Sequence, residues 1–174
     1  MIEIVSVTLE NEMDLVLAHK KADSLGSQLK LTVTTRTVFA TAISEVSREI
    51  IEKTNTGSVM LGIFQDGDRF ALQATIRCGG SECFNADDPG FIYARKLVPH
   101  YHEYTEGGVR YVDLRINIPS STRITPVKIE KLIYFFEKVT PFTPYEMIKR
   151  KMTSYSALAE EREEELKQSK YLDE

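Results

Sequence analysis

The hydrophobic and polar positions along the chain change period several times, and each period predicts a different element. Residues 2–9 alternate between apolar and polar side chains, which is typical of a strand with one buried face. After Asn11, a residue that favours helix N-caps, apolar residues repeat at helical spacing as far as Gly26, where we expect the helix to end. A second helical repeat predicts a long helix over residues 34–53.

Beyond this helix the pattern becomes extended. Two β-rich runs, residues 58–64 and 70–78, flank an Asp66-Gly67 pair that predicts a hairpin, because Asp-Gly tolerates positive φ. Residues 79–90 follow no regular pattern and predict a loop. A short helix and two further strands are predicted over residues 91–98, 102–105 and 109–118. This order of elements favours an α+β fold, a two-layer sandwich in which a largely antiparallel mixed sheet is covered on one face by helices.

Composition agrees with a globular chain and excludes several functions. Hydrophobic residues make up 42% and charged residues 28% of the 174 residues, enough for one sizeable core with an appendage. A net charge of −4 offers no basic footprint for nucleic acid. No apolar run approaches the roughly 18 residues of a membrane span, and the N-terminus lacks a signal segment. We therefore expect no membrane segment and a cytoplasmic location.

The two cysteines, Cys78 and Cys83, have four residues between them. A zinc site would need further ligands, and the nearby His100 and His102 offer no obvious closing geometry. In a cytoplasmic chain the default for such a pair is two reduced structural thiols, which is what we predict.

A row of polar residues on the second helix is the first candidate for chemistry. Thr41, Glu45 and Glu49 recur four residues apart, away from the apolar face. Two carboxylates one turn apart oppose helix formation unless a cation separates them, and Arg48 is the nearest one. A solvated helix face is one interpretation of this row, and a functional site is the other.

The stretch Thr41-Ala42-Ile43-Ser44-Glu45-Val46-Ser47-Arg48-Glu49 resembles the first nucleotide-binding box of the GHKL ATPase family, and is most similar to that of the anti-sigma-factor serine kinases. In that family the Glu is the general base or orients water, and an Asn four residues later holds magnesium. The resemblance implies a catalytic role for Glu45 if the chain is active, and it places Glu49 at the metal position. A carboxylate there can bind magnesium, but without the cation it repels a triphosphate.

The glycine boxes of the family are incomplete in this chain. The Asp-x-Gly-x-Gly turn corresponds to residues 76–81, where two glycines remain and the Asp is missing. The second box should precede Tyr93, but residues 87–91 offer one glycine and two acids. Ordinary turn chemistry for the glycines and helix N-capping by the acids are the alternative interpretations. The nucleotide-binding positions implied by the resemblance are Thr41, Glu45, Glu49, Gly79, Gly80 and Gly90.

A further helix is predicted to begin at Thr125-Pro126 and to end before Pro141, and Thr143 begins the next one at capping-box spacing. Apolar residues then recur at alternating steps of three and four, which indicates a coiled-coil seam. The apolar seam positions are Tyr145, Ile148, Met152, Tyr155, Ala159 and Leu166, and Arg162 occupies the one remaining seam position between the last two. We expect homodimerisation through this helix. The alternatives are a helix that packs on its own domain and a solvated acidic tail.

These features divide the chain into a GHKL-like domain over residues 1–119, a connecting helix over 120–142 and a coiled-coil-like helix over 143–174. The favoured function is a bacterial signal-transduction regulatory module, with nucleotide binding weak or lost, that passes the binding of a partner protein or ligand to its C-terminal helix. No cofactor is then expected. The second function is an active ATP-dependent protein serine kinase, with ATP and magnesium bound through Glu45 and Glu49. The third is an unrelated α+β protein-binding domain.

Overall fold

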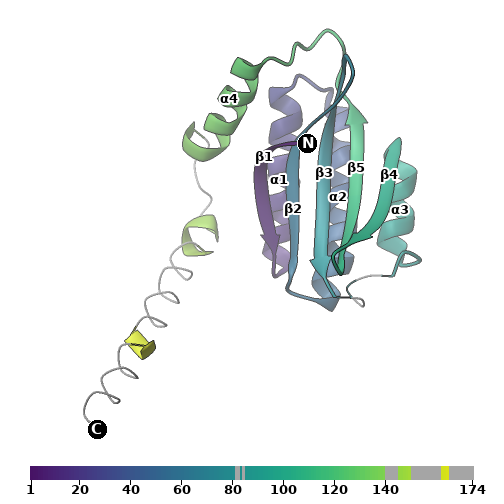
Figure 1. Cartoon of the computed structure of the whole chain (residues 1–174), viewed down its shortest axis with the longest axis vertical. Helices are drawn as coiled ribbons and strands as arrows, with labels where there is room; N and C mark the ends of the chain where they lie inside the picture. The colour runs from purple at the N-terminus through teal and green to yellow at the C-terminus, as the bar shows by residue number, and fades with distance from the viewer. Residues whose placement is uncertain (81–82, 84, 140–144, 150–161, 165–174) are drawn as a thin grey trace. The chain divides into compact units, whose positions relative to one another are not determined.

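Figure 1 shows the computed structural model, which describes residues 1–80, 83, 85–139, 145–149 and 162–164. The chain forms two compact units, Met1–Glu137 and Lys138–Glu174. All of the strands described lie in the first unit. Among the residues that the structure describes, none of the helices combines the length and the apolar character needed to span a bilayer.

The sheet has five strands in the order β1-β2-β3-β5-β4, and every pairing is antiparallel. The strands are β1 Ile2–Leu9, β2 Gly57–Asp66, β3 Arg69–Gly79, β4 His100–Glu106 and β5 Val109–Asn117. The turn between β2 and β3 has Gly67 at φ 61°, which is the positive φ that the Asp-Gly pair predicted.

Helices cover one face of this sheet, so the predicted two-layer α+β fold is confirmed. The covering helices are α1 Glu12–Gln28, α2 Val33–Lys53 and α3 Pro89–Leu97. A fourth helix, α4 Pro126–Tyr134, follows β5 and continues into the π-helix η1 Phe135–Val139. In Figure 1, α1 and α2 run behind the sheet and α3 lies behind β4.

The core lies between this helical layer and the sheet. Val59, Ile76 and Val112 form one cross-strand row and are fully buried. Opposite them, the apolar face of α2 is also fully buried, through Phe39, Ile43, Val46 and Ile50. The apolar positions whose spacing predicted these elements are therefore the ones buried between the helices and the sheet.

Gly26 does not end the first helix, so that prediction was wrong. Asn11 caps the helix as expected, accepting from the backbone N–H of Met13 at 2.9 Å, but α1 continues past Gly26 to Gln28. A Cβ on Gly26 would lie 2.7 Å from the Cβ of Arg36. The glycine therefore allows α1 and α2 to pack closely, and the chain reverses later, at Lys30 with φ 61°.

The helix predicted at Thr125 is present as α4. The Thr125 hydroxyl oxygen accepts from the backbone N–H of Lys128 at 3.2 Å, and Leu132 and Phe136 of its apolar face are buried. In the predicted seam, Tyr145 and Ile148 lie in one described helical segment, residues 145–149, and Arg162 lies in another, residues 162–164. The remaining seam positions, Met152, Tyr155, Ala159 and Leu166, lie outside the described residues, so the coiled coil stays a prediction.

Candidate functional site

The polar row on α2 is present, but its carboxylates have different partners. The Glu45 Oε1 atom lies 3.1 Å from Arg48 Nη1, so the nearest cation that the sequence indicated pairs with Glu45. The Glu49 Oε1 atom accepts a hydrogen bond of 2.9 Å from the backbone N–H of Gly90. Thr41 lies one turn before Glu45 on the same helix. Glu49 and Gly90, 41 residues apart, are thus brought into direct contact.

Gly90 lies where the first turn of α3 packs against the backbone of α2. A Cβ at this position would lie 2.6 Å from the carbonyl oxygen of Glu45 and 2.6 Å from the Cγ atom of Glu49. Only a glycine fits without displacement, and Gly90 is buried. The N–H groups at a helix N-terminus favour an anion, because they carry positive partial charge. Here the carboxylate of Glu49 accepts from one of these groups, the N–H of Gly90.

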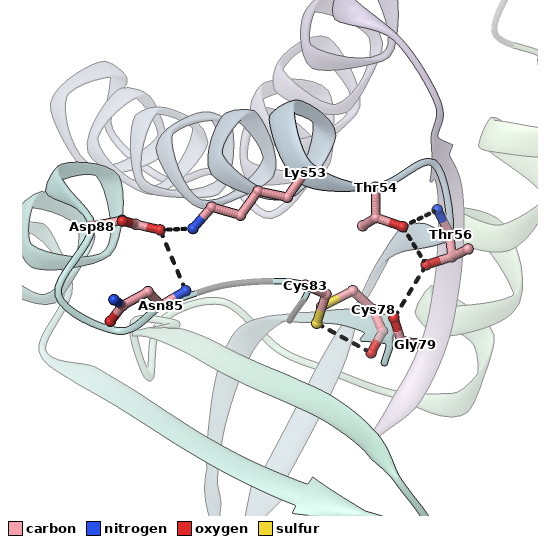
Figure 2. Close-up of a disulfide and its surroundings, with 8 residues drawn as sticks. All are labelled: Lys53, Thr54, Thr56, Cys78, Gly79, Cys83, Asn85 and Asp88. Carbon is pink, nitrogen blue, oxygen red and sulfur yellow. Dashed lines mark hydrogen bonds and ion pairs between the residues drawn. A yellow bond between two sulfur atoms is a disulfide. The ribbon is translucent and has the colours of Figure 1, made fainter. Parts of the chain in front are cut away.

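Asp88 stands at the N-cap of α3, as predicted, but it does not cap the helix through its side chain. Its carboxylate pairs with the Lys53 ammonium group, and its Oδ2 atom accepts from the backbone N–H of Asn85 at 3.3 Å. Figure 2 shows Lys53 reaching from the end of α2 to this carboxylate. The hydrogen bond from Lys53 is the main cause that holds the pKa of Asp88 below its ordinary value, and desolvation opposes it.

Cys78 and Cys83 form a disulfide, so the prediction of two reduced thiols was wrong. Their Cα atoms lie 6.1 Å apart, within the normal range for a bridge, and both residues are buried. Cys78 lies next to the last residue of β3, and the bridge joins this strand to the loop that leads to α3 (Figure 2). The Cys83 sulfur also lies 3.6 Å from the Cys78 carbonyl oxygen, to which a reduced thiol could donate.

The glycine pair after Cys78 forms the bend at the start of this loop. Gly79 ends β3, and its carbonyl oxygen accepts a 3.5 Å hydrogen bond from the Thr56 hydroxyl (Figure 2). Gly80 has φ 99°, a backbone conformation that favours glycine, and a Cβ there would meet nothing within 4 Å. Turn chemistry therefore accounts for Gly80 without a ligand.

A shallow groove of about 430 Å³ lies between α1 and α2, and Thr41 and Glu45 of the polar row on α2 line it. Its lining residues are Leu15, Val16, His19, Lys20, Thr41, Ser44, Glu45 and Arg48. The His19 Nδ1 atom lies 3.3 Å from the hydroxyl oxygen of Ser44. Sequence reasoning missed His19, since a single histidine on a helix gives no spacing signal. Across the described ranges, no group of three His, Cys, Asp or Glu side chains gathers in a metal-binding cluster.

The contact between Lys53 and Asp88 makes a testable prediction about protonation. Replacing Lys53 by Met is expected to raise the pKa of Asp88 towards the ordinary value of 3.8, because the largest cause of its lowering is removed. The carboxyl ¹³C resonance of Asp88, followed over acidic pH, measures this shift. The native pair stabilises the fold above the unfolded-state pKa, and this contribution is lost as the pH falls through the folded-state pKa. An unchanged pKa in the variant would contradict the ion pair.

Comparison with known proteins gives a likeness of fold. No family model matches the sequence, and no curated protein matches it either. The fold is similar to the crystal structure of the RsbU and RsbW domains of Rv1364c from Mycobacterium tuberculosis, with a TM-score of 0.51 and 15% sequence identity. The match covers 64% of this chain and 31% of that one. At this identity the likeness shows the fold alone.

Proposed function

We propose that the chain is a regulatory module of bacterial signal transduction that keeps a histidine kinase-like ATPase fold and binds ATP weakly or not at all. The observation that carries the proposal is the hydrogen bond from Gly90 to Glu49. In the family that the motif resembles, the helix start corresponding to α3 lies under the phosphates. In this chain that helix start already holds a carboxylate of its own.

Two physical effects act against a polyphosphate at this position. A phosphate would have to displace the Glu49 carboxylate from the Gly90 N–H while lying close to both Glu45 and Glu49. Two like charges 4 Å apart repel by about 4 kcal/mol at the effective dielectric of about 20 found near protein surfaces. The second effect is steric, because the close contact of Gly90 with the α2 backbone leaves no room for a phosphate between α3 and α2.

Calorimetric titration with ATP and ADP, each with and without magnesium, tests the proposal. We expect no saturable heat, because the anion position is filled and the glycine boxes are incomplete. A dissociation constant in the micromolar range, with the ¹⁵N–H signal of Gly90 shifting over the same titration, would overturn it. Glu49→Gln separates the two effects, since it removes the charge but keeps the shape and an acceptor for Gly90. If this variant binds ATP, the charge of Glu49 is what excludes ATP from the native chain. If the variant still does not bind ATP, the close packing of α3 on α2 excludes it.

An active protein serine kinase is the second candidate, favoured by the position of Glu45. Its side chain keeps 26% of its area exposed and lines the groove between α1 and α2, where a substrate hydroxyl could approach. Phosphoryl transfer from labelled ATP, with Glu45→Ala as the variant, tests this function. Transfer by the native chain that is lost in a folded variant would favour the kinase over the regulatory module.

The C-terminal helix is the proposed output, acting through a partner protein and a homodimer in the cytoplasm. Removing residues 144–174 is expected to lower the mass measured by light scattering from that of a dimer to that of a monomer, since the seam would be lost. In the full chain, Ile148→Asp should weaken the dimer because it places a charge in the seam. Met147→Asp is the matched control, because it places the same charge on an exposed residue outside the seam. A mass that the truncation leaves unchanged would remove this role.

A further inference from the structure

A second concave site lies at the other end of β3 from Gly79 and the disulfide. It is a cavity of about 580 Å³, within the size range of small-molecule sites. Its lining residues are Asp68, Arg69, Phe70, Asn117, Ile118, Pro119, Ser120, Thr122, Arg123, Ile124 and Thr125. All of them belong to the first compact unit. We call this site the hairpin cavity, after the β2–β3 hairpin that forms one wall.

Both walls of the hairpin cavity are fixed by hydrogen bonds. The backbone N–H of Ile118 donates to the carbonyl oxygen of Phe70 at 3.0 Å, which joins the chain after β5 to the start of β3. Further along, the Thr122 hydroxyl donates to the carbonyl oxygen of Leu29 at 3.2 Å and anchors the second wall to the end of α1. A ligand would therefore meet a largely formed site, which lowers the entropic cost of binding.

Two arginines line the hairpin cavity without a partner. Among the described residues, neither Arg69 nor Arg123 has a hydrogen bond or an ion pair from its side chain. Two other arginines of the same unit are in ion pairs, Arg36 with Asp23 and Arg48 with Glu45. Guanidinium groups are the side chains best suited to grip a carboxylate or a phosphate, because they can donate two parallel hydrogen bonds.

The other lining residues indicate which further groups a ligand of this cavity would carry. Asp68 is the one carboxylate, so two arginines and one aspartate leave the lining with one net positive charge. Asn117 and Ser120 add polar groups that can donate hydrogen bonds. Phe70, Ile118 and Ile124 supply apolar surface. The lining thus combines a cationic pair with an apolar wall, which suits an anion that carries an apolar group.

We propose that the hairpin cavity binds a small organic anion, whose carboxylate or phosphate group is held by Arg69 and Arg123 and whose apolar part contacts Phe70. This site is separate from the contact between Glu49 and Gly90, and it does not depend on whether that contact excludes nucleotides. It is also independent of the C-terminal helix.

An NMR titration of the full chain tests the proposal with three probes of similar size. Benzoate and phenyl phosphate represent the two anionic groups, and benzyl alcohol has the same ring without the charge. We expect saturable shifts of the Arg69 and Arg123 Nε–H signals with at least one anion, and the stronger of the two identifies the group preferred. Equal binding of benzyl alcohol, or no saturation with either anion, would overturn the proposal.

Four substitutions assign the binding to this site. Arg69→Gln and Arg123→Gln together should weaken the binding of the anion about tenfold or more, because two charged contacts are lost. Asp68→Asn should strengthen it, since the opposing carboxylate is removed. Arg77→Gln is the matched control, because Arg77 is exposed near the far end of β3 and does not line the cavity. Equal weakening by Arg77→Gln, or weaker binding after Asp68→Asn, would refute the assignment. Unchanged melting temperatures confirm that each variant is folded.

Discussion

Replacing Cys78 and Cys83 by serine is expected to lower the free energy of unfolding by about 2 kcal/mol, the chain-entropy estimate for a bridge that closes a loop of about six residues. The bridge restricts the unfolded chain, and in the folded state both residues are buried beside the end of β3. Urea unfolding of the native and variant chains measures the difference. The single variants Cys78→Ser and Cys83→Ser should each match the double variant, because either one removes the bridge.

Reduced native protein is the natural control for this prediction, since it loses the bridge without losing a sulfur atom. Its unfolding free energy should fall to nearly the value of the double variant. Equal stability of native, reduced and variant chains would show that the two thiols are unpaired. Alkylation of the protein as it leaves the cell, followed by mass measurement, determines which state is present in a reducing compartment such as the cytoplasm.

The sequence predicted the features that depend on local periodicity. The apolar face of α2 and the role of Arg48 beside Glu45 follow from residues three or four positions apart, so both were predicted correctly. The antiparallel sheet was predicted for a similar reason, because the β2–β3 turn is set by Gly67 and its neighbours.

Three features that the sequence did not predict depend on contacts between residues that are not neighbours in a helix or a turn. Gly26 has the chemistry of a helix end, and only the approach of Arg36 on α2 shows that it is a packing glycine. Asp88 has the chemistry of a cap, but Lys53 at the end of α2 binds its carboxylate instead. The bridge at Cys83 likewise needs the chain to reverse at Gly80, which cysteine spacing alone does not indicate. In each case a tertiary contact decided between two local interpretations.

Gly90→Ala is expected to lower the free energy of unfolding by about 1–3 kcal/mol, the usual cost of overpacking a close contact. The added Cβ would lie 2.6 Å from the Glu45 carbonyl oxygen, a backbone atom that cannot rotate away. Gly79→Ala is the matched control, because its Cβ would meet only the Thr56 hydroxyl at 3.8 Å. Urea unfolding measures both changes, and the ¹⁵N–H shift of residue 90 reports whether its hydrogen bond to Glu49 survives.

This substitution also tests the basis of the proposed function. If α3 is held tightly on α2, the new methyl group must strain the contact, and stability falls even though Gly79→Ala has little effect. If Gly90→Ala costs nothing and the hydrogen bond to Glu49 breaks, α3 moves off α2 at negligible cost. The anion position at its N-terminus would then be open to a phosphate, and the closed contact between Gly90 and Glu49 could no longer explain the exclusion of ATP.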